Sequence, residues 1–305
     1  MLVLLGAAGC KKSDDDTTKP SLSGLALDSD ASSFMPENTV VHVKANIDDL
    51  ITSDDTTPEA VGIYYMVNGG DRDTLTTNVR LSNPTYTVQL GEAGVYTIYC
   101  YAYAGDDYYS TSTTQSITVV NPETAIKGLS GEAGTEVGGH LYHTMEAQGK
   151  TWMGNNLYGT GTGKYYSNSE VLSSVFGHYY TWEEAQSACP DGWHLPSAAE
   201  FDECLGNKSG ALMANADFID VTMWEYWPAV VISNSTAFNA IPVGYMDFTY
   251  PDSPEGGYKE YACFWTADEK DGLGLFRYIY KESDTVQKGQ GSKQSLAMSV
   301  RCVKD

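Results

Sequence analysis

The chain has 305 residues, which is long enough for two ordinary domains. Its formal net charge of -22 argues against a nucleic-acid partner, because Lys and Arg contacts to phosphates supply most of nucleic-acid affinity. Charged residues make up 19% and aromatic residues 12%, with 22 tyrosines, so the composition is that of a folded chain rich in amphipathic rings.

The first residues, MLVLLGAAGC, are a short apolar run followed by small residues that lead to Cys10. This arrangement resembles the lipobox of bacterial lipoproteins, which implies that Cys10 is acylated and that residues 1–9 belong to a signal peptide. No basic segment precedes the apolar run, so we expect the signal to begin upstream of Met1. No other segment approaches the length of a membrane helix.

Residues 10–21 have no apolar periodicity and predict a flexible acidic tether. The lysines and the acidic run after Cys10 resemble the export signal of lipoproteins in Bacteroidetes-type bacteria. The resemblance implies a lipid-anchored protein on the outer face of the outer membrane, at the cell surface. The alternative is a plain polar linker without an address.

Residues 22–121 alternate between apolar and polar positions with turns between, which predicts an all-β domain of half-buried antiparallel strands. Asn68, Gly69 and Gly70 supply a tight hairpin turn between the third and fourth strands. We expect seven strands, at 24–28, 39–47, 61–68, 73–81, 84–90, 94–104 and 114–120.

The strand at 94–104 begins Gly-Val-Tyr-Thr-Ile, which resembles the tyrosine corner of immunoglobulin-like sandwiches, with Ile98 in place of the usual cysteine. The domain is similar to the Ig-like or PKD-like modules of bacterial surface proteins, which implies a stalk. Calcium between its loops would need Asp71 and Asp73, or Asp106 and Asp107. These pairs lack the spaced oxygen ligands of a dedicated site, so we expect no metal and no cofactor.

Residues 122–137 are rich in Gly and predict a linker between the two domains. Beyond it, Gln148 and Gly149 predict a hairpin. Thr181 and Glu184 form a capping box for a helix that carries Cys189 on its apolar face. Pro190 ends this helix. A second capping box, Ser-Ala-Ala-Glu at 197–200, opens another helix with an apolar side.

Five blocks, including GKTWMGNNLY and GHYYTWEEAQSACPDGWHLPSAAEFDECLG, resemble the ordered signature of the Fibrobacter major paralogous domain family over residues 138–305. That family is similar to C-type-lectin-like proteins, which implies an α+β domain of two helices on a small twisted sheet. The resemblance also implies a disulfide between Cys189 and Cys302. Such a bridge would close a loop of more than a hundred residues.

The remaining cysteines, Cys100, Cys204 and Cys263, are the candidates for a cysteine-dependent enzyme activity. Cys204 and Cys263 either pair with each other or remain buried thiols, and Cys100 faces the core of the first domain. The formylglycine-generating enzymes share the lectin-like core and use a pair of cysteines, so such an oxidase is a third alternative. The chain has no G-x-S-x-G elbow and no phosphate loop, so we expect no catalytic residues and no enzyme activity.

The sugar-binding motifs of calcium-dependent lectins, Glu-Pro-Asn or Gln-Pro-Asp followed by Trp-Asn-Asp, are missing from the sequence. The loop region at about 207–262 nevertheless carries rings flanked by carboxylates, which suit a glycan or a protein surface. We therefore expect non-enzymatic adhesion or ligand capture, the alternative being a pilus-associated or surface-assembly subunit. The candidate ligand-binding residues are Trp224, Tyr226, Trp227, Tyr245, Asp247, Tyr250, Asp252 and Tyr258.

Overall fold

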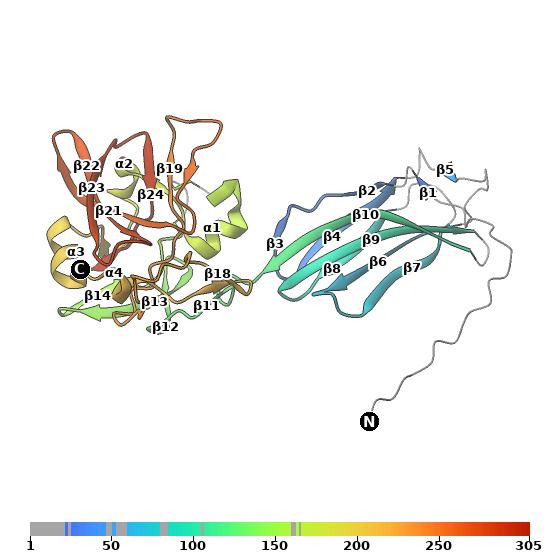
Figure 1. Ribbon diagram of the computed structural model, residues 1–305, viewed down its shortest axis with the longest axis horizontal. Helices are drawn as coiled ribbons and strands as arrows, with labels where there is room; N and C mark the ends of the chain where they lie inside the picture. The colour runs from blue at the N-terminus through green and yellow to red at the C-terminus, as the bar shows by residue number, and fades with distance from the viewer. Residues whose placement is uncertain are drawn as a thin grey trace, which may run out of the picture. The chain divides into compact units, whose positions relative to one another are not determined.

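The computed structural model describes residues 22–23, 26–46, 51–52, 60–79, 85–104, 107–159, 163–164 and 166–305. These residues form mostly β-strands, and their helices are short. The described chain divides into two compact units (Figure 1). The second unit takes in Thr118–Asp305 together with Ser33–Thr39 and Gly91–Gly94, and the first unit takes in the rest. Cys10, the tether and Asp106 lie outside the described residues.

The seven strands predicted for the first domain are all present, with ends shifted by up to seven residues. They are β2 (Ala26–Ser29), β4 (Thr39–Asn46), β6 (Ala60–Val67), β7 (Arg72–Val79), β8 (Thr85–Leu90), β9 (Gly94–Ala104) and β10 (Asp107–Val120). The short strands β1 (Leu22–Ser23), β3 (Phe34–Pro36) and β5 (Ile51–Thr52) accompany them. The sheet orders are β2-β4-β8, β3-β10-β9-β6-β7 and β1-β5.

The strands of the first unit bury alternate side chains, since successive residues of a strand point to opposite faces. Val41 and Val43 of β4 and Ile98 and Cys100 of β9 are all buried. Cys100 is a free thiol in this core, as predicted, and burial raises its pKa to about 12. The hairpin between β6 and β7 turns at Asn68, whose φ of 51° lies in the left-handed region.

The second unit combines short strands with short helices. Its helices are η1 (Tyr166–Asn168), α1 (Glu170–Phe176), α2 (Trp182–Ala185), α3 (Ala198–Leu205) and α4 (Ser209–Leu212). Its strands are β11 (Ile126–Lys127), β12 (Glu132–Val137), β13 (His140–Ala147), β14 (Lys150–Met153), β15 (Tyr180–Thr181), β16 (Trp193–His194), β17 (Asp217–Phe218), β18 (Val221–Thr222), β19 (Tyr245–Asp247), β20 (Glu255–Gly256), β21 (Tyr261–Lys270), β22 (Leu273–Tyr280), β23 (Gln287–Gly291), β24 (Leu296–Met298) and β25 (Val303–Lys304).

These strands form four small sheets. Their orders are β12-β13-β14-β25-β16, β15-β24-β19-β20, β21-β22-β23 and β11-β17-β18. Figure 1 draws β19 and β21 to β24 in orange and red within one part of the unit. Backbone hydrogen bonds join the sheet of β19 and β24 to the sheet of β21, β22 and β23. The N–H of Gly244, just before β19, donates to the carbonyl of Tyr261, and the N–H of Ser299, just after β24, donates to the carbonyl of Cys263. The candidate site lies between these two sheets.

The prediction of a linker at 122–137 was wrong. The strand β11 pairs with β17, and β12 pairs with β13, so this segment forms part of the second unit. Its strands are short: Gly131, at positive φ, lies just before β12, and Gly134, also at positive φ, lies where the register of β12 with β13 shifts. Interrupted pairing of this kind leaves no apolar alternation in the sequence, which is why composition alone indicated a linker.

Both predicted capping boxes are present. Thr181 accepts a hydrogen bond from the N–H of Glu184, whose carboxylate in turn accepts from the N–H of Thr181. Ser197 and Glu200 do the same at the start of α3. The helix α2 ends at Ala185, earlier than predicted, and the chain continues through turns to Cys189. Cys189 is disulfide-bonded to Cys302, with the two Cα atoms 5.9 Å apart, as the family resemblance implied.

Candidate functional site

A groove lined by aromatic side chains lies between the sheet of β19 and β24 and the sheet of β21, β22 and β23. It encloses a cavity of about 400 Å³. We call it the aromatic groove, and its lining residues are Tyr245, Asp247, Tyr261, Cys263, Phe276, Tyr278, Lys288, Gly289, Leu296 and Met298.

Strand geometry explains why these residues meet. Tyr261 and Cys263 are two apart on β21, and Phe276 and Tyr278 are two apart on β22, so each pair shares one face of its strand. Cys263 of β21 pairs with Tyr278 of β22, and Phe276 of β22 pairs with Gly289 of β23. The lining residues of the three strands therefore lie on the same face of the sheet. One wall of the groove is therefore a single sheet face with three half-buried rings.

The facing wall follows the same rule. Tyr245 and Asp247 flank Met246 on β19, and Met246 pairs with Ala297 between Leu296 and Met298. Met246 points away from the groove and lines a different cavity. Across the groove the rings of Tyr245 and Tyr261 meet edge to face, with centroids 6.3 Å apart.

Glycines allow two of the rings to lie close to the backbone. A Cβ atom on Gly289 would lie 2.2 Å from Cζ of Phe276, and one on Gly257 would lie 2.6 Å from Cδ2 of Tyr261. A real Cβ does not approach another atom so closely, so any larger residue would displace the ring. The two glycines thus fix where these rings stand in the groove.

The polar atoms of the groove are well placed for a ligand with hydroxyl groups. No described residue hydrogen-bonds to the hydroxyls of Tyr245, Tyr261 or Tyr278, each of which can donate and accept. Asp247 accepts a hydrogen bond from the N–H of Thr249 through Oδ1, 2.9 Å away, and its second carboxylate oxygen is another acceptor. Lys288 donates to Asp202 at 2.7 Å.

The cysteine in the groove does not suit redox or nucleophilic chemistry. Cys263 is 3% exposed, and burial raises the pKa of its thiol to about 12, so the reactive thiolate is rare at neutral pH. The alternative of a second disulfide was wrong, because Cys204 and Cys263 are both free thiols. Cys204 packs against a different core cluster from that of Cys263, and it does not line the groove.

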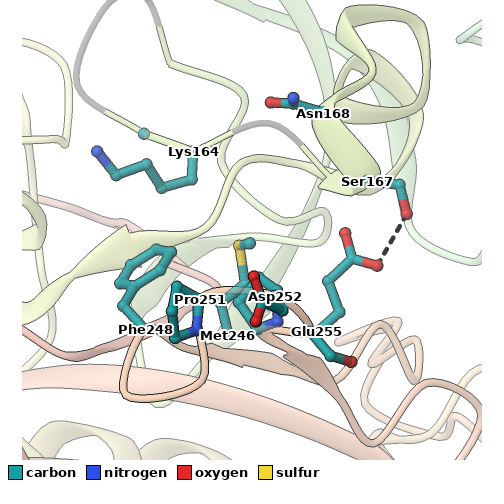
Figure 2. A pocket seen from close by; sticks show the side chains of 11 residues that line it. Lys164, Ser167, Asn168, Met246, Phe248, Pro251, Asp252 and Glu255 are labelled. Carbon is teal, nitrogen blue, oxygen red and sulfur yellow. Dashed lines mark hydrogen bonds between the residues drawn. The ribbon is translucent and has the colours of Figure 1, made fainter.

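A second and larger cavity, of about 750 Å³, lies on the other face of β19 (Figure 2). Met246 and Phe248 form part of its apolar lining, and Lys164, Asp252 and Glu255 are polar residues at its wall. Figure 2 shows the hydrogen bond that Ser167 donates to Glu255, at 3.0 Å. Among the described residues of this lining, Phe248 is the one that carries an aromatic ring, compared with four in the aromatic groove.

The eight candidate residues predicted from the sequence do not lie together in one site. Tyr245 and Asp247 line the aromatic groove, and Asp252 lines the second cavity. The prediction for Trp224 was wrong: its ring is 3% exposed within the core, and its indole N–H donates to the carbonyl of Ala240 at 3.1 Å. A ligand cannot reach this ring.

The remaining four candidates lie at the surface but line neither cavity. Tyr226 is 83% exposed and Tyr250 is 65% exposed, while Trp227 and Tyr258 are about four-tenths exposed. The ring of Tyr258 lies 6.0 Å from that of Tyr166, so it also packs against the unit. These residues do not converge on one site with Tyr245.

Sequence reasoning missed Tyr261, Phe276 and Tyr278, which form most of the stacking surface. The segments YACFW and LFRYIY carry aromatic residues at alternate positions, and that period of two could have placed them on one strand face. Phe276 and Tyr278 lie beyond the loop region at 207–262, and Tyr261 lies at its end, where the strand β21 begins.

One of the comparisons with known proteins matches the second unit. A model of the Fibrobacter succinogenes major domain matches residues 142–304. The chain belongs to this family. The matched segment includes all ten lining residues of the aromatic groove and both disulfide cysteines, so the candidate site is part of the Fibrobacter succinogenes major domain.

A comparison with solved structures found a likeness to the CARDB domain of a Pyrococcus furiosus protein in complex with di-metal ions. The identity is 15%, the match covers 34% of this chain and 90% of that chain, and the TM-score is 0.20. At that score the likeness supports no statement about fold or metal binding. The comparison with curated proteins found no match.

Proposed function

We propose that this protein binds a glycan, without chemical conversion, through the aromatic groove of its Fibrobacter succinogenes major domain. The observation that carries the proposal is the gathering of Tyr245, Tyr261, Phe276 and Tyr278 around one open cavity. Aromatic faces stack on the C–H faces of sugar rings, and hydroxyls and a carboxylate beside them give the directional hydrogen bonds that orient a sugar. A protein surface is the second ligand class that such a groove suits.

The finer fold assignments belong to the same proposal. We infer a C-type-lectin-like domain over residues 138–305, supported by short helices beside small sheets and by the Cys189–Cys302 bridge. We infer an Ig-like sandwich for the first unit. The inference is supported by its β-sheets, whose strands bury alternate residues, and by the burial of Tyr96 and Ile98. In this proposal the first unit serves as a stalk and the second as a binding head.

We also propose that the protein is a lipoprotein anchored through Cys10 at the outer face of the outer membrane. The proposal is supported by the lipobox-like segment, by the acidic tether and by the Cys189–Cys302 disulfide, because disulfides persist mainly in exported proteins. No helix among the described residues is both long and apolar enough to cross a membrane. Protease treatment of intact cells tests the location, and full protection of the protein would contradict it.

A glycan array tests the binding function. The purified protein should bind a subset of glycans, and Tyr278→Ala should weaken that binding by roughly tenfold, because a well-packed aromatic contact contributes on the order of 1.4 kcal/mol or more. Tyr250→Ala is the matched control, since it removes an exposed tyrosine outside the groove. Parallel arrays with calcium and with a chelator should give the same pattern.

Two results of the array would speak against the proposal. A blank array in both conditions would favour a protein ligand or an assembly role, and multimers in solution would then support assembly. Binding that survives Tyr278→Ala but is lost with Tyr250→Ala would move the site away from the aromatic groove.

A further inference from the structure

Two charged residues line the aromatic groove, and a neighbouring residue offsets the charge of one of them. Of its lining residues, all of which are described, Asp247 is the one anion and Lys288 the one cation. The ammonium of Lys288 already donates to Oδ2 of Asp202, at 2.7 Å, so a neighbouring carboxylate offsets its charge. No described lysine or arginine forms an ion pair with Asp247.

The surroundings add to this negative potential. Burial raises the pKa of the Tyr245 hydroxyl, and the nearby negative charges of Asp247 and Glu260 raise it further. Burial likewise raises the pKa of Tyr261, and Glu260 adds to the effect. Both rings line the groove together with Asp247, whereas Glu260 is ion-paired with Lys281 at 2.9 Å and lies outside the lining. A ligand stacked on these rings would therefore meet the carboxylate of Asp247.

The hydrogen-bonding groups of the groove also favour a ligand with uncharged hydroxyl groups over a ligand with a negative charge. The hydroxyls of Tyr245, Tyr261 and Tyr278 both donate and accept, and the carboxylate of Asp247 only accepts. A sugar hydroxyl can donate to Asp247 and accept from a tyrosine. A ligand carboxylate or sulfate cannot donate to Asp247, and its charge would be repelled at close range.

From these contacts we infer that the aromatic groove selects neutral sugars, such as hexoses and N-acetylhexosamines, and rejects sugars that carry a carboxylate or a sulfate. The inference rests on the proposed glycan-binding function and names its ligand class. It assigns Asp247 as the residue that determines the selection, and it gives Lys288 no part in recruiting an anion.

The test uses pairs of oligosaccharides that differ only in one carboxylate, for example a galactose oligomer and the same oligomer with one galacturonate residue. Titration of the purified protein at neutral pH and low salt should give at least tenfold tighter binding of the neutral member. Asp247→Asn should reduce this ratio to about threefold or less, because it removes the charge and keeps an oxygen for the N–H of Thr249. The ratio should also fall as salt is raised, because ions screen the repulsion.

Asp252→Asn is the matched control, since it makes the same change outside the aromatic groove, and it should leave the ratio at tenfold or more. Equal or tighter binding of the acidic member, lost with Lys288→Gln, would overturn the inference and leave the groove as a glycan site. If neither member of any pair binds, the proposed function fails together with the inference.

Discussion

Replacing Arg301 with methionine is expected to lower the free energy of unfolding of the second unit by about 3 kcal/mol. Arg301 is fully buried, and its guanidinium donates to Asn156 Oδ1 at 2.9 Å and to the carbonyls of Phe238 at 2.7 Å and Asn239 at 3.0 Å. It also stacks on the ring of Phe238, with 4.6 Å from Cζ to the centroid. Methionine fills similar space but leaves these acceptors without donors.

One effect acts in the opposite direction. Burial lowers the pKa of the Arg301 guanidinium to about 9, so the buried charge is itself costly, and methionine removes that cost. We expect the loss of hydrogen bonds to outweigh it, because several strands and loops meet at this one side chain. The partners come from segments between 62 and 148 residues away in the sequence.

Urea unfolding followed by tryptophan fluorescence measures this effect in the second unit alone, since all six tryptophans lie there. Lys304→Met is the matched control, because Lys304 is exposed near Arg301 in the sequence and should change stability by about 0.5 kcal/mol or less. An Arg301→Met variant as stable as the control would show that the guanidinium does not organise the core.

Removing the disulfide is expected to have the largest effect on stability. The bond joins residues 113 apart in the sequence, and in the chain-entropy model a loop of that length stabilises the folded state by roughly 4 to 5 kcal/mol. The double variant Cys189→Ala with Cys302→Ala should lose about that much free energy of unfolding. It leaves no unpaired thiol from the bridge to confuse the result.

The control for this prediction is Cys204→Ala. Cys204 is a half-buried free thiol, so its loss should cost about 1 kcal/mol or less. Urea unfolding without reductant measures both variants beside the wild type. Equal stability of the double variant and the wild type would mean that the bridge does not restrain the unfolded chain.

Local signals in the sequence were enough for much of the fold. A period of two predicted the strands of the first unit, and Thr181 with Glu184 and Ser197 with Glu200 predicted both helix starts, because caps depend on residues three apart. The pairing of Cys189 with Cys302 was predicted from the family resemblance and not from a local signal. The pairing of β11 with β17, which joins residues about 90 apart, has no local signal and was missed.

The candidate site was only partly predictable for the same reason. Tyr245 and Asp247 were found as an aromatic residue and a carboxylate near each other in the sequence. Whether a ring faces a groove depends on which sheets face each other, and that is decided by contacts such as Ser299 with Cys263, far apart in the chain. Composition likewise does not distinguish the buried Trp224 from the exposed Tyr226 two residues later.

The most direct test of the central claim is to narrow the aromatic groove without removing any of its rings. Gly289→Ala places a methyl group where Phe276 now lies, and Gln290→Ala changes an exposed neighbour on the same strand. Calorimetric titration with a glycan found on the array should show about three- to tenfold weaker binding for Gly289→Ala and unchanged binding for Gln290→Ala. A folded Gly289→Ala protein that binds this glycan as tightly as the wild type would contradict binding in the groove.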